Sequence, residues 1–249
     1  MALTNRQEDI LEYLKRTKKA GIHELSQRLF VSDATIRREL IELKKLGLIE
    51  RNHGGAVILE SENEIAISVR TERDANDKKE TAEIALPHLP NFKSVFIDNS
   101  STALVLARMM NLRYKTVVTN GLVLASELSH REDVTVLMPG GSLFYHSNSL
   151  CGPVTLRSIS EMHFGLMLAS CSSISEDGAY ESSLEQSEIK RMALKNSTNK
   201  VLLVGRTKFG GDAMYRTASL NEYNVIFTNA ENEILEPFQR LKGVTLINK

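Results

Sequence analysis

The chain has 249 residues, of which 42% are hydrophobic and 25% are charged, and its formal net charge at pH 7 is zero. This is the composition of an ordinary soluble protein, and the length is enough for two domains with a substantial core. No apolar run approaches the roughly 18 residues that span a bilayer. Charged residues within positions 6–9 stand where the apolar segment of a signal peptide would begin, so we expect a cytoplasmic protein without a membrane partner.

The only two cysteines, Cys151 and Cys171, show no Cys-x-x-Cys spacing and no accompanying histidine pair. This pattern speaks against a disulfide framework or a zinc site, and we expect neither a metal nor a cofactor.

The charge is divided unevenly along the chain. Residues 1–57 contain 11 Lys and Arg against 8 Asp and Glu, whereas residues 58–249 contain 20 against 23. A basic N-terminal segment joined to an acidic remainder is typical of a small DNA-binding domain attached to a larger body.

Apolar residues at helical spacing predict three helices in the N-terminal segment, over 6–16, 23–30 and 33–46. We expect residues 18–21 to end the first helix and Gly47 to end the third as a left-handed stop. The second and third helices are joined by a very short turn, and the third bears basic residues. This arrangement predicts a helix-turn-helix.

The third helix is expected to bury one stripe and to expose another. At about 100° per residue, Ile36, Leu40 and Leu43 fall on one side, and short or cationic side chains fall on the other. That division suits a helix whose N-terminal half enters the major groove of DNA. Ser32 is placed to cap this helix through its hydroxyl.

Four residues at the start of the third helix are candidate DNA contacts: Ser32, Thr35, Arg37 and Arg38. An arginine can donate two hydrogen bonds to a guanine or hold a phosphate, and the first amides of a helix favour a phosphate. Taken alone, an Arg-Arg pair indicates an ordinary solvated face rather than a DNA contact. Within a helix-turn-helix, however, the position of the pair favours a contact with DNA.

Two short strands, Leu48–Arg51 and Ala56–Leu59, are predicted on either side of a Gly-Gly turn, and together they form a β-hairpin wing. Arg51 and His53 near its tip are placed to contact the sugar-phosphate backbone, which is a positioning role. The alternative for His53 is an exposed turn residue without a role.

Strand and helix signals alternate after this point, which predicts an α/β fold with a largely parallel central sheet. Strands are expected over 94–98, 115–118, 134–138, 164–169, 200–204, 224–228 and 244–247. Helices are expected over 79–86, 102–110, 122–128, 153–159, 185–196 and 233–240. We therefore divide the chain into a winged helix-turn-helix domain (1–58), a linker without packed structure (59–78) and an α/β domain (79–249).

Ligands of such α/β folds gather at the carboxyl ends of the strands. Three of these ends carry hydroxyls, amides or glycines able to hold an anion or a sugar: Asp98, Ser100, Ser101, Thr102, Thr119, Asn120, Gly140 and Gly141. Lys208 could supply a cation. Each group alone has an ordinary explanation, because Ser-Thr at a helix start is usually a cap and Gly-Gly is usually a turn. Glu188 and Lys190 are expected on a solvated helix face.

The N-terminal domain resembles that of the DeoR family of bacterial transcription regulators, through residues 31–40, Gly47, Arg51 and the wing sequence 53–56. The remainder resembles the sensor domain of that family, through motifs at 98–102, 118–120, 140–141, 152, 178, 188–190 and 208–210. The resemblance implies a sensor domain similar in fold to ribose-5-phosphate isomerase and CoA transferases, which detects a phosphorylated sugar or a related metabolite.

Several positions depart from the family pattern. Gly205 and Asn229 stand where the family usually has aspartates, Thr207 replaces a serine, and His163 occupies a place where an aspartate often begins a strand. Glu39 replaces an aspartate and preserves its charge. Fewer carboxylates at one end of the sheet alter which hydroxyls a pocket can bind.

The resemblance implies a homo-oligomeric repressor of sugar-metabolism genes, released from its double-stranded DNA operator by a phosphorylated sugar. The alternatives are a DNA-binding protein whose sensor domain has lost or changed its ligand, or a sugar-phosphate isomerase-like enzyme. The chain lacks a Gly-x-Ser-x-Gly elbow, a His-Glu-x-x-His motif and a Cys/His nucleophile pair, and fold similarity does not carry activity with it. We therefore expect no enzyme. The effector, the operator, the number of subunits and the choice between repression and activation stay open.

Overall fold

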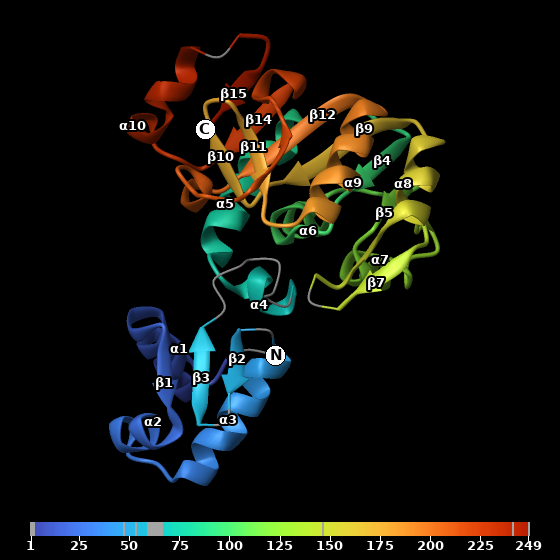
Figure 1. Ribbon diagram of the computed structural model, residues 1–249. Coiled ribbons are helices and arrows are strands. Elements are labelled where there is room, and N and C mark those ends of the chain that lie inside the picture. The colour runs from blue at the N-terminus through green and yellow to red at the C-terminus, as the bar shows by residue number, and fades with distance from the viewer. Residues whose placement is uncertain are drawn as a thin grey trace. The chain divides into compact units, whose positions relative to one another are not determined.

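The structure of the protein is a computed structural model that describes residues 3–46, 48–52, 54–58, 67–145, 147–240 and 242–248. Gly47, His53 and the first part of the expected linker, 59–66, lie outside the described residues. The chain divides into two compact units, Met1–Arg73 and Asp74–Lys249 (Figure 1). We refer to them as the head and the body.

The head contains a helix-turn-helix followed by a hairpin (Figure 1). Its elements up to the hairpin are α1 (Asn5–Thr17), β1 (Lys19–Gly21), α2 (Ile22–Leu29), α3 (Asp33–Lys45), β2 (Ile49–Asn52) and β3 (Gly55–Ile58). The strands form an antiparallel sheet in the order β1-β3-β2. The predicted winged helix-turn-helix is confirmed, with its strands displaced by one residue.

Strand β1 corrects the sequence-based expectation that residues 18–21 only end a helix. Ala20 pairs with Ala56, and Gly21 pairs with Gly55. A Cβ atom on Gly55 would lie 2.0 Å from the carbonyl oxygen of Ala20, so this position admits only glycine. The strand forms because β3 is available as a partner, and no local pattern in the sequence indicates it.

The predicted apolar stripe of α3 is confirmed. Ile36, Leu40 and Leu43 are fully buried and pack with apolar residues of α1, α2 and the sheet. Burying a side chain of this size contributes roughly 1.5–3 kcal/mol. The stripe therefore fixes which side of α3 faces outward.

The segment assigned to a linker is partly helical. Ile67–Glu72 form α4, with Ile67 buried, and α5 begins at Ala75 rather than at the predicted Lys79. The expectation of a connector without packed structure is therefore wrong for this part. The boundaries 1–58, 59–78 and 79–249 stay a prediction.

In the described part of the body, seven parallel strands form the central sheet in the order β15-β14-β12-β9-β4-β5-β6. Their bounds are β4 (Ser94–Ile97), β5 (Thr116–Thr119), β6 (Thr135–Leu137), β9 (Phe164–Ser170), β12 (Ser197–Val204), β14 (Val225–Thr228) and β15 (Thr245–Ile247). The predicted α/β fold with a parallel sheet is confirmed.

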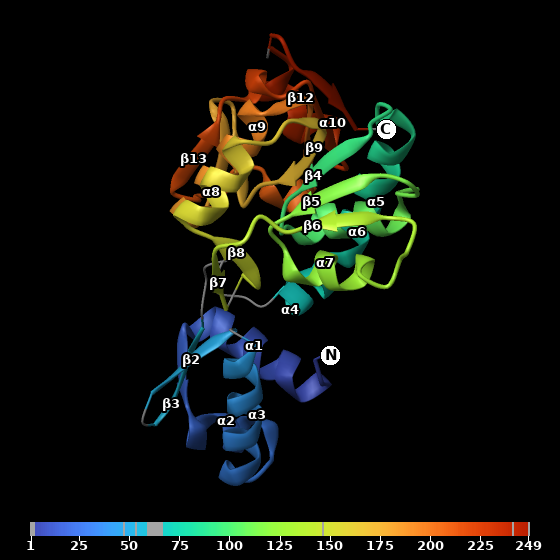
Figure 2. The same cartoon turned by 90° about the vertical axis from the view of Figure 1, so that its right-hand side faces the viewer.

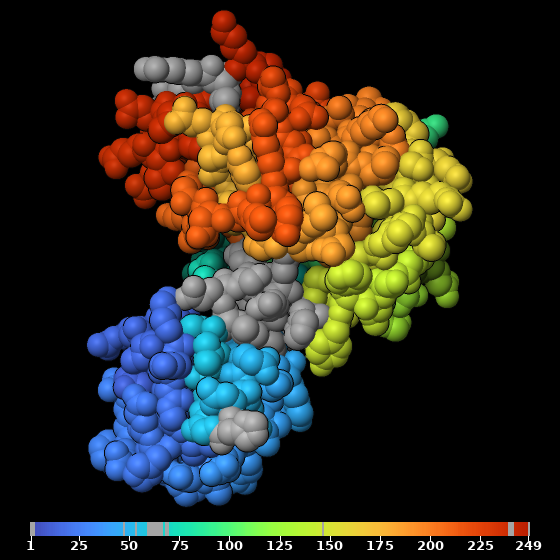
Figure 3. Space-filling model, viewed as in Figure 1, coloured from blue at the N-terminus to red at the C-terminus, as the bar shows by residue number. Residues whose placement is uncertain are grey.

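Helices cover both faces of this sheet (Figure 2). One face is covered by α5 (Ala75–Ala85), α6 (Ser101–Met109) and α7 (Leu122–Leu128). The other is covered by α8 (Pro153–Ser160) and α9 (Leu184–Lys195), which form part of the outer surface in Figure 3. Successive strand residues point to opposite faces, so Phe96 packs in the α9 layer while Val95 and Ile97 pack in the α6 layer.

Two small antiparallel sheets complete the body in segments to which the sequence analysis assigns no strand. They are the hairpin of β7 (Ser142–Phe144) and β8 (Ser149–Cys151), and the sheet of β10 (Ser173–Ser175), β11 (Gly178–Glu181) and β13 (Tyr215–Ala218). Helix α10 (Asn232–Leu235) and 3-10 turns at Leu86–His88, Arg206–Lys208, Leu220–Glu222 and Glu236–Arg240 lie in the connections. No helix in the described part of the chain is both long and apolar enough to cross a membrane.

Candidate nucleic-acid interface and ligand site

The start of α3 is organised by Ser32. Its hydroxyl accepts a hydrogen bond from the amide of Thr35 at 3.2 Å, and the two hydroxyls lie 2.9 Å apart. The cap predicted from the sequence is thus confirmed. Ser32 is exposed and Thr35 is half-buried, so the capped end of the helix is open to solvent. The first amides of a helix carry partial positive charge, which favours a phosphate at this end.

Arg37 and Arg38 are both exposed on α3. Arg38 forms no hydrogen bond or ion pair with any residue that the structure describes, so its guanidinium is available to another molecule. Arg37 lies near Asp33, whose pKa is lowered chiefly by a hydrogen bond from Ser26 and further by the charges of His23 and Arg37. The two arginines therefore present cations outward, as a DNA-reading helix requires.

Glu39 fastens α3 to α1. Its carboxylate accepts hydrogen bonds from Arg6 Nη1 at 2.8 Å and from Gln7 Nε2 at 3.0 Å. Gln7 also takes part in the capping box that starts α1 at Thr4. The charge at position 39 consequently has a structural use inside the head, which the sequence does not indicate.

The wing offers less than the sequence predicts. Arg51 in β2 is half-buried, and its Nε atom is buried without a hydrogen-bond partner among the described residues. His53 lies outside the described residues. A contact of either side chain with the DNA backbone stays a prediction.

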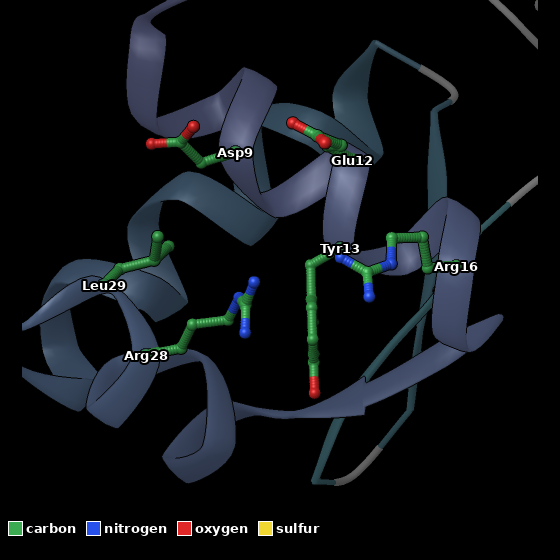
Figure 4. A pocket seen from close by; sticks show the side chains of 6 residues that line it. All are labelled: Asp9, Glu12, Tyr13, Arg16, Arg28 and Leu29. Carbon is green, nitrogen blue, oxygen red and sulfur yellow. The ribbon is translucent and has the colours of Figure 1, made fainter.

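A recess of about 310 Å³ lies between α1 and α2 (Figure 4). Figure 4 shows Arg16 and Arg28 converging on Tyr13, and the Arg28 guanidinium lies 4.4 Å from the centre of the Tyr13 ring. Tyr13 donates a hydrogen bond to Glu24 at 2.6 Å, which lowers the pKa of that carboxyl. The aromatic ring and one of the two cations thus already have partners within the head.

In the body, Asp98 follows β4 and is buried. Its Oδ1 accepts a hydrogen bond from the Ser100 amide at 3.0 Å, and its Oδ2 accepts from the Ser170 amide at 3.1 Å and from Lys190 Nζ at 3.0 Å. Both oxygens are therefore engaged by the protein. The role expected for Asp98 from the sequence, accepting hydrogen bonds from sugar hydroxyls, stays a prediction. In the structure, Asp98 holds the ends of β4 and β9 together.

Lys190 lies in the interior, and the expectation of a solvated face for it is wrong. Its side chain is 5% exposed, and its ammonium donates to the carboxylates of Asp98 and Glu181 and to the Ser170 carbonyl. Burial opposes its ionisation, but the two carboxylates outweigh that effect and raise the pKa of Lys190. We call Lys190, Asp98 and Glu181 the buried triad.

The helical spacing contained a signal for this burial. Gln186, Lys190 and Leu194 are four residues apart and all buried, so they form one inward stripe of α9. A lysine between a glutamine and a leucine on such a stripe indicates a buried ion pair. Composition alone suggests an exposed helix.

The hydroxyls at the start of α6 are placed as the sequence predicts. Ser100 caps the helix by accepting from the Ala103 amide at 3.2 Å, and Ser101 and Thr102 follow, both buried. At the end of β5, Thr119 Oγ1 accepts from the Gly121 amide at 3.0 Å. These groups lie at the edge of the sheet where a ligand would bind.

Asn120 is the most informative residue at this edge. It is fully buried, and its amide group donates to the Leu150 carbonyl and to Gln186 Oε1, both at 3.3 Å. Its Oδ1 atom is buried and accepts no hydrogen bond within the described residues. A buried acceptor of this kind requires a donor, which a ligand hydroxyl or a water molecule would supply.

The structure brings some of the predicted site residues together and separates others. A Cβ atom on Gly121 would lie 3.1 Å from Asn99 Cα, so the loops after β4 and β5 touch. Lys208 follows β12, which is separated from β4 by β9, and it is half-buried. Its expected part in the site stays a prediction.

Gly140 and Gly141 are required by the backbone conformation and by close packing. Both have positive φ angles, 72° and 117°, and a Cβ atom on Gly141 would lie 2.1 Å from Thr155 Oγ1. Thr155 donates a hydrogen bond to the Gly140 carbonyl at 2.6 Å. The pair therefore forms a turn that seats α8, and a ligand contact there stays a prediction.

Asn229, where the family usually has an aspartate, is used as a donor. Its amide donates to Asp77 Oδ1 at 3.1 Å and to Glu80 Oε2 at 2.9 Å, and its Oδ1 accepts from the Arg206 amide at 2.8 Å. The bond from Asn229 is the main cause that lowers the pKa of Glu80. An aspartate cannot donate these bonds, so the surrounding carboxylates fit asparagine.

The head and the body together define a class of protein. A capped helix with outward cations, followed by a wing, defines a DNA-binding regulator of transcription, and the parallel α/β body is the type of domain in which ligands bind at strand ends. Residues 6–62 match the DeoR-like helix-turn-helix domain, and residues 73–230 match the DeoR C terminal sensor domain. The chain belongs to the DeoR family of regulators.

Two relatives cover nearly the whole chain. The glycerol-3-phosphate regulon repressor of Escherichia coli (strain K12) is 31% identical over 232 residues, which are 92% of each chain. An uncharacterized HTH-type transcriptional regulator of Bacillus subtilis (strain 168), YulB, is also 31% identical, over 92% of this chain and 90% of that protein.

Among solved structures, ribose 5 phosphate isomerase A from Neisseria gonorrhoeae overlaps 53% of this chain and 52% of that one, with a TM-score of 0.36 and 16% sequence identity. An overlap of this extent supports no argument about activity.

Proposed function

We propose that the protein is a homo-oligomeric transcriptional repressor that binds operator DNA through α3 and its wing. The proposal is carried by one observation, the exposed Arg38 without a partner among the described residues on a helix capped by Ser32. Arg37 and Thr35 would share the contact, and Arg51 and His53 would hold the DNA backbone. In this function the protein is not an enzyme.

The test compares Arg38→Ala with Arg16→Ala, which removes the same charge from the exposed face of α1. Both variants lose one cation, so the difference between them isolates the role of α3. We expect Arg38→Ala to cost about 1–3 kcal/mol of specific binding to a duplex selected by the wild type. Equal affinity of the two variants in a gel-shift titration would remove Arg38 from the interface.

We further propose that a phosphorylated sugar or polyol binds at the ends of β4 and β5 and lowers operator affinity. The class of ligand follows the name of the Escherichia coli relative, a glycerol-3-phosphate regulon repressor. Ser101 and Thr102 at the start of α6 suit the phosphate, and the buried Asn120 Oδ1 suits a ligand hydroxyl. The ligand would act by binding more tightly to the state with low affinity for DNA.

Thermal shifts with glycerol 3-phosphate, other phosphorylated sugars and their unphosphorylated counterparts test this site. We expect a shift with a phosphorylated compound only, and a smaller shift in Asn120→Ala. Lys208→Ala decides whether the lysine supplies a cation, since an undiminished shift in that variant would remove it from the pocket.

A second candidate function is a DNA-binding regulator whose sensor site has changed its ligand. Asn229 favours it, because its side-chain amide donates hydrogen bonds to Asp77 and Glu80, which a carboxylate at this position could not do. If no phosphorylated sugar releases the protein from its selected duplex, this alternative takes precedence. The homo-oligomer is tested separately by sedimentation of the full chain, where a monomer at micromolar concentration would contradict it.

A further inference from the structure

Phe30 occupies a backbone conformation that its side chain disfavours. It ends α2 with φ 53° and ψ 42°, in the left-handed region, and its amide donates to the Ser26 carbonyl. The amide of Val31 donates to the same carbonyl at 3.1 Å. Helices often end with such a residue, but glycine or asparagine is usual there. A Cβ atom crowds the following carbonyl oxygen, which glycine avoids, and asparagine compensates through local hydrogen bonds of its short side chain.

The side chain of Phe30 also gains nothing from packing. It is 94% exposed, more than any other large apolar side chain in the described part of the chain. Burial normally offsets the strain of a bulky residue in the left-handed region, and here burial is absent. Both the backbone and the solvent therefore disfavour phenylalanine at this position, so stability of the folded chain does not account for it.

The position of Phe30 in the head suggests what covers the ring. It precedes Ser32, the cap of α3, by two residues, so their Cα atoms lie within about 7 Å of each other. The capped end of α3 is the end that enters the major groove in the proposed function. An aromatic side chain two residues away is within reach of the same duplex.

We propose that Phe30 is a DNA-contacting residue that packs its ring on the apolar surface of the duplex beside α3. This inference rests on the proposed binding of DNA by α3. Duplex DNA offers two such surfaces, the C5-methyl group of thymine in the major groove and the deoxyribose of the backbone. Contact between phenylalanine and the thymine methyl is an established form of base recognition.

The first arm of the test separates binding from stability. Phe30→Asn removes the ring and places a residue that tolerates the left-handed conformation. We expect the melting temperature of the head to rise by a few degrees, and the affinity for a duplex selected by the wild type to fall at least about fivefold. Phe30→Leu keeps apolar bulk and strain, and it should bind more tightly than Phe30→Asn.

Tyr114 provides a matched control in the body. It is also an aromatic residue in the left-handed region, with φ 59°, and it is 82% exposed. Tyr114→Asn should therefore stabilise the body without any change in affinity for the duplex.

The second arm replaces each thymine of the selected duplex by uracil, which removes only the methyl group. If one replacement weakens the wild type but not Phe30→Asn, the ring contacts that methyl. If Phe30→Asn is weaker on every duplex, with no such coupling, the ring packs on deoxyribose. Both results support the proposal.

Three results would overturn it. Phe30→Asn could bind the duplex as tightly as the wild type, or melt at a lower temperature than the wild type. It could also change the oligomeric state while each oligomer binds DNA unchanged, which would place the ring in a protein contact. Arg38→Ala, measured beside it, separates the two proposals, because its failure to weaken binding removes Arg38 from the interface, whereas the Phe30 result concerns the ring alone.

Discussion

The head and the body treat charge in opposite ways. In the head, Arg37 and Arg38, the cations of α3 proposed to meet DNA, are exposed, and Arg38 has no partner among the described residues. In the body, Asp98 at the carboxyl end of β4 is buried, and both Asp98 and Glu181 form ion pairs with the buried Lys190. A charge at a protein surface keeps its hydration until a ligand arrives, whereas a buried charge must be paired from the start.

This difference limits what each region can recognise. The head can bind a polyanion with unpaired arginines, and its affinity will fall as salt rises. The buried triad leaves uncharged groups to meet a ligand in the body, chiefly the amide of Asn120 and the hydroxyls at the start of α6. If the proposed ligand binds there, these uncharged groups would contact its hydroxyls, and the N-terminus of α6 would face its phosphate.

The largest effect is expected for Lys190→Met, which tests whether the charges of the body are structural. The variant leaves Asp98 and Glu181 buried without their cation, and removing one partner of a buried pair costs about 3–5 kcal/mol. Chemical denaturation followed by circular dichroism should show an early transition of the body. Lys79→Met is the control, because Lys79 on α5 is 67% exposed and only 3.6 Å from Glu83. If both variants unfold alike, the buried triad does not support the fold.

Leu40→Ala tests the corresponding support in the head. Leu40 is fully buried on α3, and its truncation should cost about 2–5 kcal/mol. The neighbouring Ile41 is 39% exposed, so Ile41→Ala is a control in the same helix and should change stability much less. The head should melt earlier in Leu40→Ala while the body keeps its melting temperature. A joint shift of both transitions would contradict the separation of the chain into two units.

The sequence predicts the head well because its signals are local. Helical spacing identifies Ile36, Leu40 and Leu43 as the buried stripe, and a serine before an acidic first turn identifies the cap. Strand β1 escapes prediction, since three residues with one apolar side chain show no strand pattern until β3 pairs with them. Its existence depends on contacts far along the chain.

In the body the sequence predicts the sheet but not the use of its charges. Apolar runs identify the buried strands, because both faces of a parallel sheet are covered. The role of Asp98 follows from Lys190, which is 92 positions away in the chain and on another helix. The β7–β8 hairpin likewise depends on tertiary contacts, such as the bond from the Leu150 amide to the Asn120 carbonyl. Such long-range pairings leave no periodic trace.

A smaller loss of stability is expected for Glu39→Ala, which tests whether a charged side chain also stabilises the fold of the head. Glu39 is 16% exposed and accepts bonds from Arg6 and Gln7, so its loss should cost about 1–2 kcal/mol. Glu42→Ala is the matched control, because Glu42 on the same helix pairs only at the surface with Lys45. Should Glu42→Ala destabilise the head as much as Glu39→Ala, the link between α1 and α3 contributes nothing of its own.

The smallest effect on stability is expected for Cys151, a buried thiol in the body that is uncharged at neutral pH. It tests how the stability of the body depends on alkaline pH. Burial raises the pKa of its thiol from about 9.0 to about 11. Because the folded value is the higher one, its contribution to stability is complete below pH 9 and is lost as the pH rises toward 11. By pH 10 the loss should be about 1 kcal/mol. Melting curves of the wild type and Cys151→Ala should therefore converge or cross between pH 8 and 10.5, since every other titrating group is shared. Parallel curves would mean that the thiol ionises in the folded body as readily as in the unfolded chain, and that uncharged groups near Asn120 are more hydrated than their burial indicates.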